Sequence, residues 1–386
     1  MTYVNASTEP AIDTRAGREL DAIAELARTV ARKLIDPRAA EIDRSHEFPA
    51  DVAGALAESG LLSAAIPEQY GGGGAGMAEI ATIARELAWA DVSSTMIFTL
   101  QCTCIEVIKA LGSPEQQADL FARHLRGELF AIALTEPGAG SDARSVATRA
   151  ETVDGGYRIN GLKHYITNAR VSGVIVVIAK TDDGISAFAV DRDATGVSIT
   201  RNEPKMGLHG TTTDEIVFED VTVPVTARLG SGSEGFAALM RSLERGRVSI
   251  GAVAVGLARR CIAEATEHLA GRQQFGHALS EFQGLQFLVA DMETGTSAAD
   301  ALVVRAAEAA GTPAFRSLSA QAKSFATDNA MKVATDAVQL FGGAGYMRGV
   351  VVERMMRDAK ILQIFEGTNQ IMRQLIARDV FRRIAK

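Results

Sequence analysis

The hydrophobic period of this chain changes twice, and this change restricts the possible folds more than any other feature of the sequence. From about residue 11 to residue 126, apolar residues recur at three- and four-residue steps, as in the series Ile23, Ala27, Val30 and Leu34. Short β-rich runs replace this pattern after Glu128, and the helical period returns at about residue 234. A period near 3.6 indicates amphipathic helices, whereas short β-branched runs between turn residues indicate strands. We therefore predict an α+β multidomain fold with an N-terminal helical domain (1–127), a middle β-domain (128–233) and a C-terminal helical domain (234–386).

The middle third is predicted to be an antiparallel β-barrel or sandwich. Its β-rich runs lie at residues 174–179, 186–190, 197–200 and 215–223. The turn-forming residues Asp154, Gly155 and Gly156 stand before another such run, which is typical of a hairpin.

The last third carries four apolar stripes at helical spacing, which begin at Ile250, Leu285, Leu318 and Ile371. Four long amphipathic helices predict a four-helix bundle. In the first third, helices are expected at residues 75–90 and 113–126. Ser113 and Gln116 supply a capping box for the second of these.

Charge and composition argue against several classes of partner. The chain has 40 Lys and Arg against 47 Asp and Glu, a formal charge of −7, and no basic block. A surface for nucleic acid or an anionic membrane is therefore not expected. No run of membrane-spanning length and no secretory or transit segment is evident, and the three cysteines fit a reducing cytoplasm.

Metal and hydrolase chemistry also lack a signature. The six histidines show no ligand spacing with Cys, Asp or Glu, so no metal site is predicted. No Gly-x-Ser-x-Gly nucleophile elbow occurs in a strand-to-helix setting.

Residues 135–142 (TEPGAGSD) form the first segment with a chemical signature. Pro137 excludes a helix or central strand, and the following glycines leave backbone N–H groups accessible at close range. Thr135 and Ser141 add hydroxyls at either end. Such a loop suits an oxygen-rich planar cofactor or a phosphate, although a solvated turn would have the same composition.

Residues 363–371 (QIFEGTNQI) form the second such segment. Glu366 stands between apolar residues and a glycine, before a helix that Thr368 is suited to cap. Apolar neighbours raise the pKa of a carboxyl, and a tuned glutamate beside free backbone N–H groups suits proton abstraction next to a carbonyl. The alternative is a structural charge at a helix N-terminus.

Four more motifs follow these segments in a fixed order: residues 165–168 (YITN), 272–276 (RQQFG), 339–346 (QLFGGAGY) and 356–360 (MRDAK). With the helix–strand–helix organisation, this ordered set resembles the acyl-CoA dehydrogenase family over about residues 24–386. The resemblance implies a homotetramer that binds FAD between the middle and C-terminal domains and across to a neighbouring subunit.

The resemblance also assigns residues to the cofactor. Residues 132–141 and 165–167 are expected to cradle the isoalloxazine ring, with Thr167 near its N5 atom, and residues 339–343 are expected to reach the FAD of a partner subunit. The implied FAD contacts are Ile132, Leu134, Thr135, Gly140, Ser141, Tyr165, Ile166, Thr167, Arg272, Gln274, Phe275, Gln283, Gln339, Leu340, Gly342, Gly343, Thr368 and Gln370.

By the same resemblance, Glu366 is the catalytic base. It would take the α-proton of an acyl-CoA thioester while the β-hydrogen leaves as a hydride, and the electrons would pass to electron-transfer flavoprotein. Some relatives carry their base on the first helix of the C-terminal domain, where this chain has Gly246, which cannot serve. The implied substrate contacts are Ser141, Glu244, Arg247, Gly367, Thr95, Met96 and Thr99.

Several alternatives remain open at this point. Glu244 and Arg247 suit an ion pair at a helix start equally well. Tyr165, Ile132 and His209 depart from the residues common in the family. An acyl-carrier-protein thioester as substrate, an oxidase reaction and a non-catalytic helical assembly protein are the competing functions.

Overall fold

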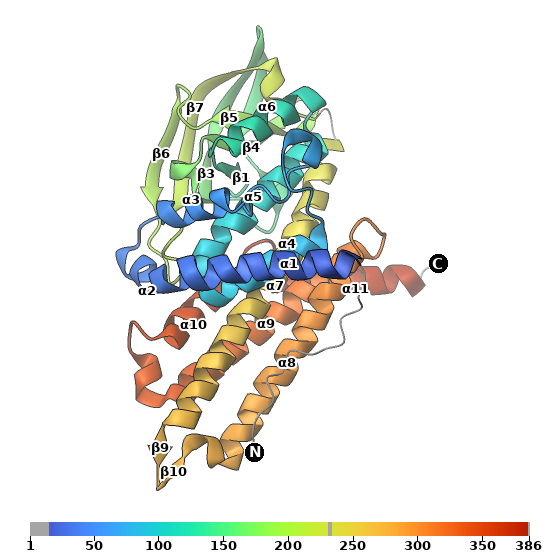
Figure 1. Cartoon of the computed structure of the whole chain (residues 1–386). Helices are drawn as coiled ribbons and strands as arrows, with labels where there is room; N and C mark the ends of the chain where they lie inside the picture. Colours follow the sequence, from blue (N-terminus) through green and yellow to red (C-terminus); the bar gives the residue numbers. More distant parts are fainter. Residues whose placement is uncertain (1–14, 231–233, 385–386) are drawn as a thin grey trace.

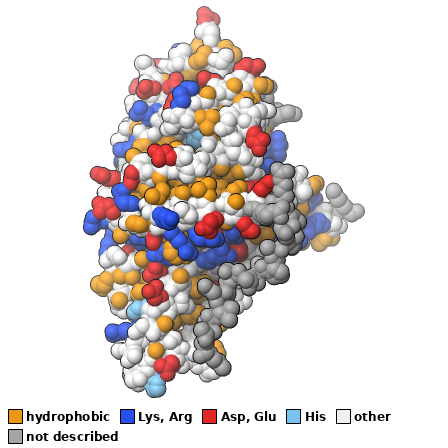
Figure 2. All heavy atoms as spheres, in the orientation of Figure 1, with side chains coloured by type: hydrophobic (Ala, Val, Ile, Leu, Met, Phe, Trp, Pro, Cys, Tyr) orange, Lys and Arg blue, Asp and Glu red, His pale blue; other side chains and the backbone are white. Residues whose placement is uncertain are grey.

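The computed structural model describes residues 15–230 and 234–384. The first residues of the predicted helical pattern (11–14) and residues 231–233, beside the predicted boundary at 233, lie outside the described residues. A β-sheet occupies one end of the molecule, long C-terminal helices occupy the other, and the N-terminal helices lie between them (Figure 1). Acidic and basic side chains are interspersed over the face shown in Figure 2.

The N-terminal part is helical, as its hydrophobic period predicts. A π-helical segment (Ala31–Ile35) joins the first two helices, so that they follow each other directly. The capping box is confirmed, because Gln116 N donates to Ser113 Oγ and Ser113 N donates to Gln116 Oε1. The helices are α1 (Arg15–Val30), α2 (Asp36–Ser45), α3 (Ala50–Glu58), α4 (Met77–Ala90), α5 (Val92–Leu111) and α6 (Pro114–Leu125).

Helix α5 corrects one expectation from the sequence. By length and composition, Val92–Leu111 could cross a membrane, so the prediction that no run reaches this length was wrong. However, most of its side chains are buried against α7, α4 and the sheet strand β1 (Phe130–Ala133). The helix is apolar on nearly every face because it forms the centre of the core.

The middle part is an eight-stranded sheet in the order β6-β7-β3-β2-β4-β5-β8, with β1 paired to β4. The predicted hairpin is present, since Val153 pairs with Gly156. All pairings are antiparallel except those of β4 with β1 and β2, which are parallel. The remaining strands are β2 (Arg149–Val153), β3 (Gly156–Thr167), β4 (Val174–Thr181), β5 (Gly184–Asp191), β6 (Val197–Asn202), β7 (Thr213–Pro224) and β8 (Arg228–Leu229).

The C-terminal part contains the four helices that the apolar stripes predict, and one more. Helices α7 (Glu234–Gly271), α8 (Gln283–Glu308) and α9 (Phe315–Phe341) pack against one another, and α11 (Asn369–Ile384) packs on α9. The additional helix α10 (Val351–Leu362) lies against α9 and α7. A short hairpin of β9 (Gln273–Gln274) and β10 (His277–Ala278) joins α7 to α8 at the far end of the bundle (Figure 1).

A buried ion pair fixes the segment that leaves β1. Lys163 on β3 has no exposed side chain, and its Nζ lies 2.7 Å from Glu136 Oε1 and 3.1 Å from the carbonyl oxygen of Leu134. Glu136 also accepts hydrogen bonds from the amide and hydroxyl of Thr148. Although burial acts to raise the pKa of Glu136, these hydrogen bonds lower it. Lys163 therefore supplies the positive charge that compensates the buried carboxylate.

We predict that Lys163→Met destabilises the protein by about 3–5 kcal/mol, because it leaves the Glu136 charge buried without its cation. Urea and thermal unfolding would measure the change. Arg158→Met on the same strand removes an exposed ion pair with Glu151 and should cost less than about 1 kcal/mol. The double variant Lys163→Met/Glu136→Gln should recover part of the loss, and equal stability of the Lys163 and Arg158 variants would contradict the prediction.

Candidate active site

A chamber of about 670 Å³ lies where the sheet, the N-terminal helices and the C-terminal helices meet. We call it the main chamber. Its walls come from α5, the end of β3, residues 203–213, α7, the second half of α10 and the segment that follows α10. The volume is in the range of small-molecule sites. Met96, Thr99, Tyr165, Thr167 and Glu366, all expected at the site from the sequence, line it.

Glu366 occupies a tight turn between α10 and α11. Its φ is 52° and that of Gly367 is 93°, so both residues have left-handed backbone. For a residue with a Cβ atom this conformation costs about 1–2 kcal/mol and persists only where the surroundings impose it. The residue after the turn stabilises the start of the next helix, because Thr368 Oγ1 accepts a hydrogen bond from Ile371 N and caps α11 as expected.

Buried polar side chains of α9 hold this turn in place. Lys323 Nζ donates to the carbonyl oxygen of Gly367 at 2.7 Å and to Asn369 Oδ1 at 3.0 Å. Asn369 Nδ2 donates to Thr327 Oγ1 at 2.9 Å and to Asp328 Oδ1 at 2.7 Å. Lys323 and Asn369 are both almost completely buried. Sequence reasoning placed Asn369 in the motif but missed Lys323, which lies 43 positions before Glu366, beside the apolar stripe that begins at Leu318.

Charges around Glu366 oppose the effect of burial. Burial raises the pKa of the Glu366 carboxyl, while Arg247 and Lys323 act to lower it. Burial also lowers the pKa of the Lys323 ammonium to about 8. Arg247 is 9% exposed, and its Nε and Nη1 atoms have no hydrogen-bond partner. A buried guanidinium without partners is costly, so this position favours a bound acceptor group.

Glu244 lies on the same helix as Arg247, one turn earlier. Burial raises the pKa of its carboxyl, and Arg247 and Arg316 oppose this effect. The Arg316 Nε atom lies 3.5 Å from Glu244 Oε1. Glu244 therefore pairs with Arg316 of α9, whereas the Nε and Nη1 atoms of Arg247 have no hydrogen-bond partner.

The sheet side of the chamber is formed by the end of β3. Tyr165 has a φ of 59°, is 59% exposed and stacks on His164 with ring centroids 4.0 Å apart. His164 N donates to the carbonyl oxygen of Thr135 at 2.9 Å, which brings the 135–142 loop beside the chamber wall. Gly138 and Gly140 have no atom within 4 Å of an ideal Cβ position, so the backbone of the loop is open as predicted.

Residues 203–213 were not assigned to the site from the sequence, although they contribute much of its wall. Leu208 N donates to Asp358 Oδ1 at 2.6 Å, and Gly207 approaches Arg357 and Asp358 so closely that a Cβ would collide with them. His209 contacts the Asp43 carbonyl oxygen at 3.0 Å and the Lys205 carbonyl oxygen at 3.0 Å. His209, which departs from the residue common in the family, therefore anchors residues 203–213 to α2.

Other predicted residues lie away from the main chamber of their own chain. Arg272, Gln274 and Phe275 belong to the β9–β10 hairpin at the far end of the bundle, and Phe275 is 90% exposed (Figure 1). Thr95 is buried, and its hydroxyl donates to the Asp91 carbonyl oxygen inside α5. The further residues that do not line the chamber are Ile132, Leu134, Thr135, Gly140, Ser141, Ile166, Glu244, Arg247, Gln283, Gln339, Leu340, Gly342, Gly343, Gly367, Thr368 and Gln370.

Comparison with known proteins identifies the family. Three family profiles match successive parts of the chain: "Acyl-CoA dehydrogenase, N-terminal domain" at residues 17–128, the middle domain at 131–221 and the C-terminal domain at 233–381. The chain belongs to the acyl-CoA dehydrogenase family. As members of this family, its homologues are acyl-CoA dehydrogenases and reductases, and the protein is an oxidoreductase that acts on CH–CH groups.

Acyl-CoA dehydrogenase relatives match the chain nearly end to end. Acryloyl-CoA reductase (NADH) of Anaerotignum propionicum is 40% identical over 96% of this chain and 97% of its own length. Butyryl-CoA dehydrogenase of Megasphaera elsdenii has a TM-score of 0.91 and 35% identity, over 94% of this chain and 98% of that one. A chain from the structure titled "Electron transferring flavoprotein of Acidaminococcus fermentans" has a TM-score of 0.92 and 37% identity, over 98% of this chain and all of that one. These matches confirm the predicted arrangement of helical, β-sheet and helical parts.

Proposed function

We propose that the protein is an FAD-dependent acyl-CoA dehydrogenase that introduces an α,β double bond into an acyl-CoA thioester. The observation that carries the proposal is a half-buried carboxylate, Glu366, on the wall of a ligand-sized chamber with two buried cations, Arg247 and Lys323, close by. A base in this setting is desolvated by its surroundings yet can be kept ionised by nearby positive charge. The same arrangement would serve the reverse reduction of an enoyl thioester.

The residues at the sheet side of the chamber fit the isoalloxazine ring of FAD. Tyr165 and Thr167 offer an aromatic face and a hydroxyl, and the 135–142 loop offers open backbone beside them. The buried amide nitrogen of Asn168, next to Thr167, has no hydrogen-bond partner. We infer that these residues hold the ring, together with Ile132, Leu134, Ser141 and Ile166. When bound, FAD supplies the acceptor for the hydride that leaves the β-carbon.

Glu366 performs the proton transfer in the proposed reaction. Its carboxylate takes the α-proton of the thioester as the β-hydrogen leaves with its electron pair, so that the electrons of the broken α C–H bond form the double bond. The charge that develops on the thioester carbonyl oxygen needs a hydrogen-bond donor, for which the backbone N–H of Glu366 is the proposed source. Glu244 and Arg247 are proposed to contact the acyl thioester or its pantetheine arm.

The remaining cofactor residues are proposed to act between subunits of a homotetramer. Arg272, Gln274 and Phe275 lie far from the main chamber of their own chain, and Phe275 exposes a large apolar ring to solvent. A second copy would cover this ring and bring Arg272 to the FAD diphosphate, which a guanidinium binds well. Gln283 and residues 339–343, at the ends of α8 and α9, are assigned the same role, and Thr368 and Gln370 complete the dinucleotide contacts.

Electron-transfer flavoprotein is the proposed electron acceptor in a cytoplasmic pathway. Tyr165, which is exposed and stacks on the partly buried His164, lines the chamber where we propose that a partner approaches the flavin. One structural neighbour comes from a structure named for the electron-transferring flavoprotein of Acidaminococcus fermentans. The alternatives are an acyl-carrier-protein thioester dehydrogenase and an acyl-CoA oxidase. Oxygen uptake with peroxide formation during turnover would identify an oxidase.

We predict that Glu366→Gln retains FAD but slows anaerobic flavin reduction by acyl-CoA about 10²-fold or more, because the general base is lost. Stopped-flow absorbance would measure the rate, and FAD content and thermal unfolding would control for folding. A variant that reduces its flavin at the wild-type rate would place the base on another residue.

We predict that Lys323→Met shifts the ascending limb of the pH–rate profile to higher pH. Removing this cation leaves the pKa of Glu366 raised by burial with less opposition, so a higher pH is needed to ionise the base. Single-turnover flavin reduction across a pH series would measure the limb. Lys332→Met, an exposed lysine on the same helix, is the control and should leave the limb in place. A limb that does not move in the Lys323 variant would show that this lysine has only a structural role.

We predict that Arg272→Ala weakens FAD retention, as measured by flavin released during gel filtration and by the FAD dissociation constant. Arg259→Ala, on the helix α7 that precedes Arg272 and paired with Asp300, is the control. FAD retained as tightly as in the control would remove Arg272 from the cofactor site.

A further inference from the structure

One acidic residue of the 356–360 motif has no part in the proposed chemistry, yet it is buried beside the main chamber. Asp358, on α10, is 1% exposed. Its Oδ1 atom accepts a hydrogen bond from Leu208 N at 2.6 Å, whereas its Oδ2 atom has no hydrogen-bond partner. Burial and the nearby Asp91 raise the pKa of this carboxyl to about 7. Burying a carboxyl with one oxygen unpartnered is costly, and groups with shifted pKa values are concentrated at functional sites.

The backbone that Asp358 binds forms a tight turn on the chamber wall. Leu208 has a φ of 52°, a left-handed conformation that is unfavourable for a residue with a Cβ atom and must be held by its surroundings. Thr211 N donates to the Leu208 carbonyl oxygen at 3.0 Å and closes the turn. At Gly207, a Cβ atom would lie 2.5 Å from Asp358 Oδ1 and 2.8 Å from the carbonyl carbon of Arg357. The turn and α10 are therefore in direct contact, with no room for a side chain between them.

The same segment, residues 203–213, is continuous with the strand beside the proposed flavin site. It ends in Thr213, the first residue of β7, which pairs with Thr167 at the end of β3. Leu208 and Thr167 both line the main chamber. A shift of the segment would therefore move the end of the strand pair that carries Thr167.

Helix α10, on the other side of this contact, leads to the proposed base. Phe365 N donates to the Ile361 carbonyl oxygen at 3.1 Å, so the hydrogen-bonded backbone continues from the helix to the residue before Glu366. The hydrogen bond between Asp358 and Leu208 thus joins the segment beside the flavin site to the helix that carries the base.

Other contacts of the segment are longer or lead elsewhere. The Arg357 Nη1 atom donates to the Met206 carbonyl oxygen at 3.3 Å, but its guanidinium is held more closely by the carboxylate of Asp43, at 2.9 and 2.6 Å. His209 joins the segment to α2 and not to α10. Among the described residues, Asp358 therefore makes the shortest hydrogen bond between this segment and α10.

We propose that Asp358 is a positioning residue, whose hydrogen bond to Leu208 sets the separation between the flavin site at Thr167 and the carboxylate of Glu366. The inference rests on the proposed function, because it requires a thioester between a flavin and this carboxylate. Asp358 does not line the main chamber, so it acts through Leu208 and not on the substrate. Reacting groups that are misplaced by about 1 Å can lose about 10²-fold in rate, so a small shift across the chamber is sufficient.

The variants Asp358→Leu and Asp358→Asn test the proposal, because leucine removes the acceptor whereas the asparagine Oδ1 atom can still accept from Leu208 N. Anaerobic flavin reduction by butanoyl-CoA or octanoyl-CoA, whichever is faster in the wild type, should slow about 10- to 100-fold in Asp358→Leu and less than about 3-fold in Asp358→Asn. The affinity for the matching unreactive thioether, butyl-CoA or octyl-CoA, should change less than about 3-fold in both variants by calorimetry, since no group that binds substrate is altered.

Two further variants separate positioning from a general loss of stability. Asp300→Leu removes the partner of Arg85 and Arg259 on α8, and it should lower the melting temperature without slowing flavin reduction. Gly207→Ala leaves Asp358 intact but displaces the segment from α10, and it should slow flavin reduction as Asp358→Leu does.

Hydrogen exchange tests the contact itself without turnover. In the FAD-bound protein, the Leu208 amide should exchange about 10-fold faster in Asp358→Leu than in the wild type, and the asparagine variant should restore its protection. Amides within α7 should exchange at the wild-type rate in both variants and serve as the internal control.

A folded, FAD-loaded Asp358→Leu protein that reduces its flavin at the wild-type rate would overturn the proposal. Equal slowing in the leucine and asparagine variants, or an equal loss of rate in Asp300→Leu, would also overturn it. If Asp358→Leu does not fold, a wild-type rate in Gly207→Ala has the same meaning. If neither thioester reduces the wild-type flavin, the proposed function fails, whereas the exchange rates still show whether Asp358 holds the segment.

Discussion

The arrangement of the site depends on the contact between Lys323 and the turn that carries Glu366. A glutamate with a φ of 52° is not stable on local preferences alone, so the surrounding structure must impose the turn. The buried ammonium does this by binding the Gly367 carbonyl oxygen and the Asn369 side chain. The same contact places a positive charge near the carboxylate. One side chain thus holds the turn and, together with Arg247, opposes the effect of burial on the pKa of Glu366.

A second buried lysine, Lys163, has a comparable structural role on the sheet side of the site. Lys163 binds Glu136 and the Leu134 carbonyl oxygen, and Glu136 in turn binds the amide and hydroxyl of Thr148. These contacts fix the start of the loop whose open backbone we assign to FAD to β3 and to Thr148 beyond the loop. Charged groups are costly to bury, and here each is matched by several hydrogen bonds. Arg247 differs from these two lysines, because two of its nitrogens have no partner, and we propose that a bound substrate supplies one.

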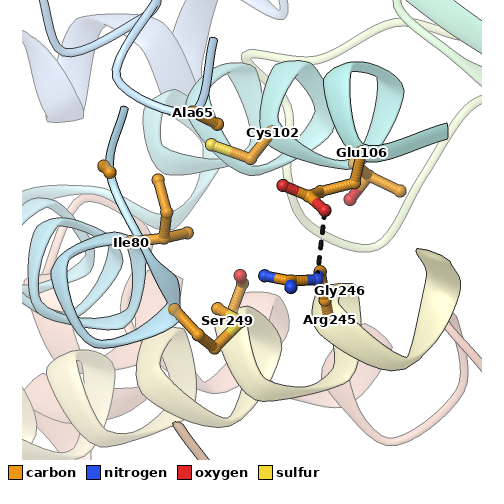
Figure 3. Close-up of a pocket in the computed structure, with 10 residues that line it drawn as sticks. Ala65, Ile80, Cys102, Glu106, Arg245, Gly246 and Ser249 are labelled. Carbon is orange, nitrogen blue, oxygen red and sulfur yellow. Dashed lines mark ion pairs between the residues drawn. The ribbon is translucent and has the colours of Figure 1, made fainter. Parts of the chain in front are cut away.

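Helices α5 and α7 pack closely beside the turn that carries Glu366. Gly246 has no side chain, and a Cβ atom at this position would lie 3.1 Å from Glu366 Oε2 and 3.3 Å from Thr103 Oγ1. The preceding residue, Arg245, pairs with Glu106 of α5 (Figure 3). A glycine at position 246 therefore lets the two helices and the Glu366 turn come together.

The sequence by itself determined the order of helical and β-rich parts, the capping box at Ser113 and the two loops that carry Thr135 and Glu366, because these features depend on residues close together in the chain. It also supported Glu366 as the base, through an ordered set of motifs. Only the tertiary structure decided that α5 is a core helix, that Lys323 lies against Gly367 and that Glu106 meets Arg245. Hydrophobic periodicity shows which face of a helix is buried, but it does not show which residue of another element lies opposite that face. The Lys323–Gly367 contact joins positions 44 residues apart in the chain, and the Glu106–Arg245 contact joins positions 139 residues apart. A buried lysine and an apolar neighbour on the same stripe have the same period, and only packing distinguishes them.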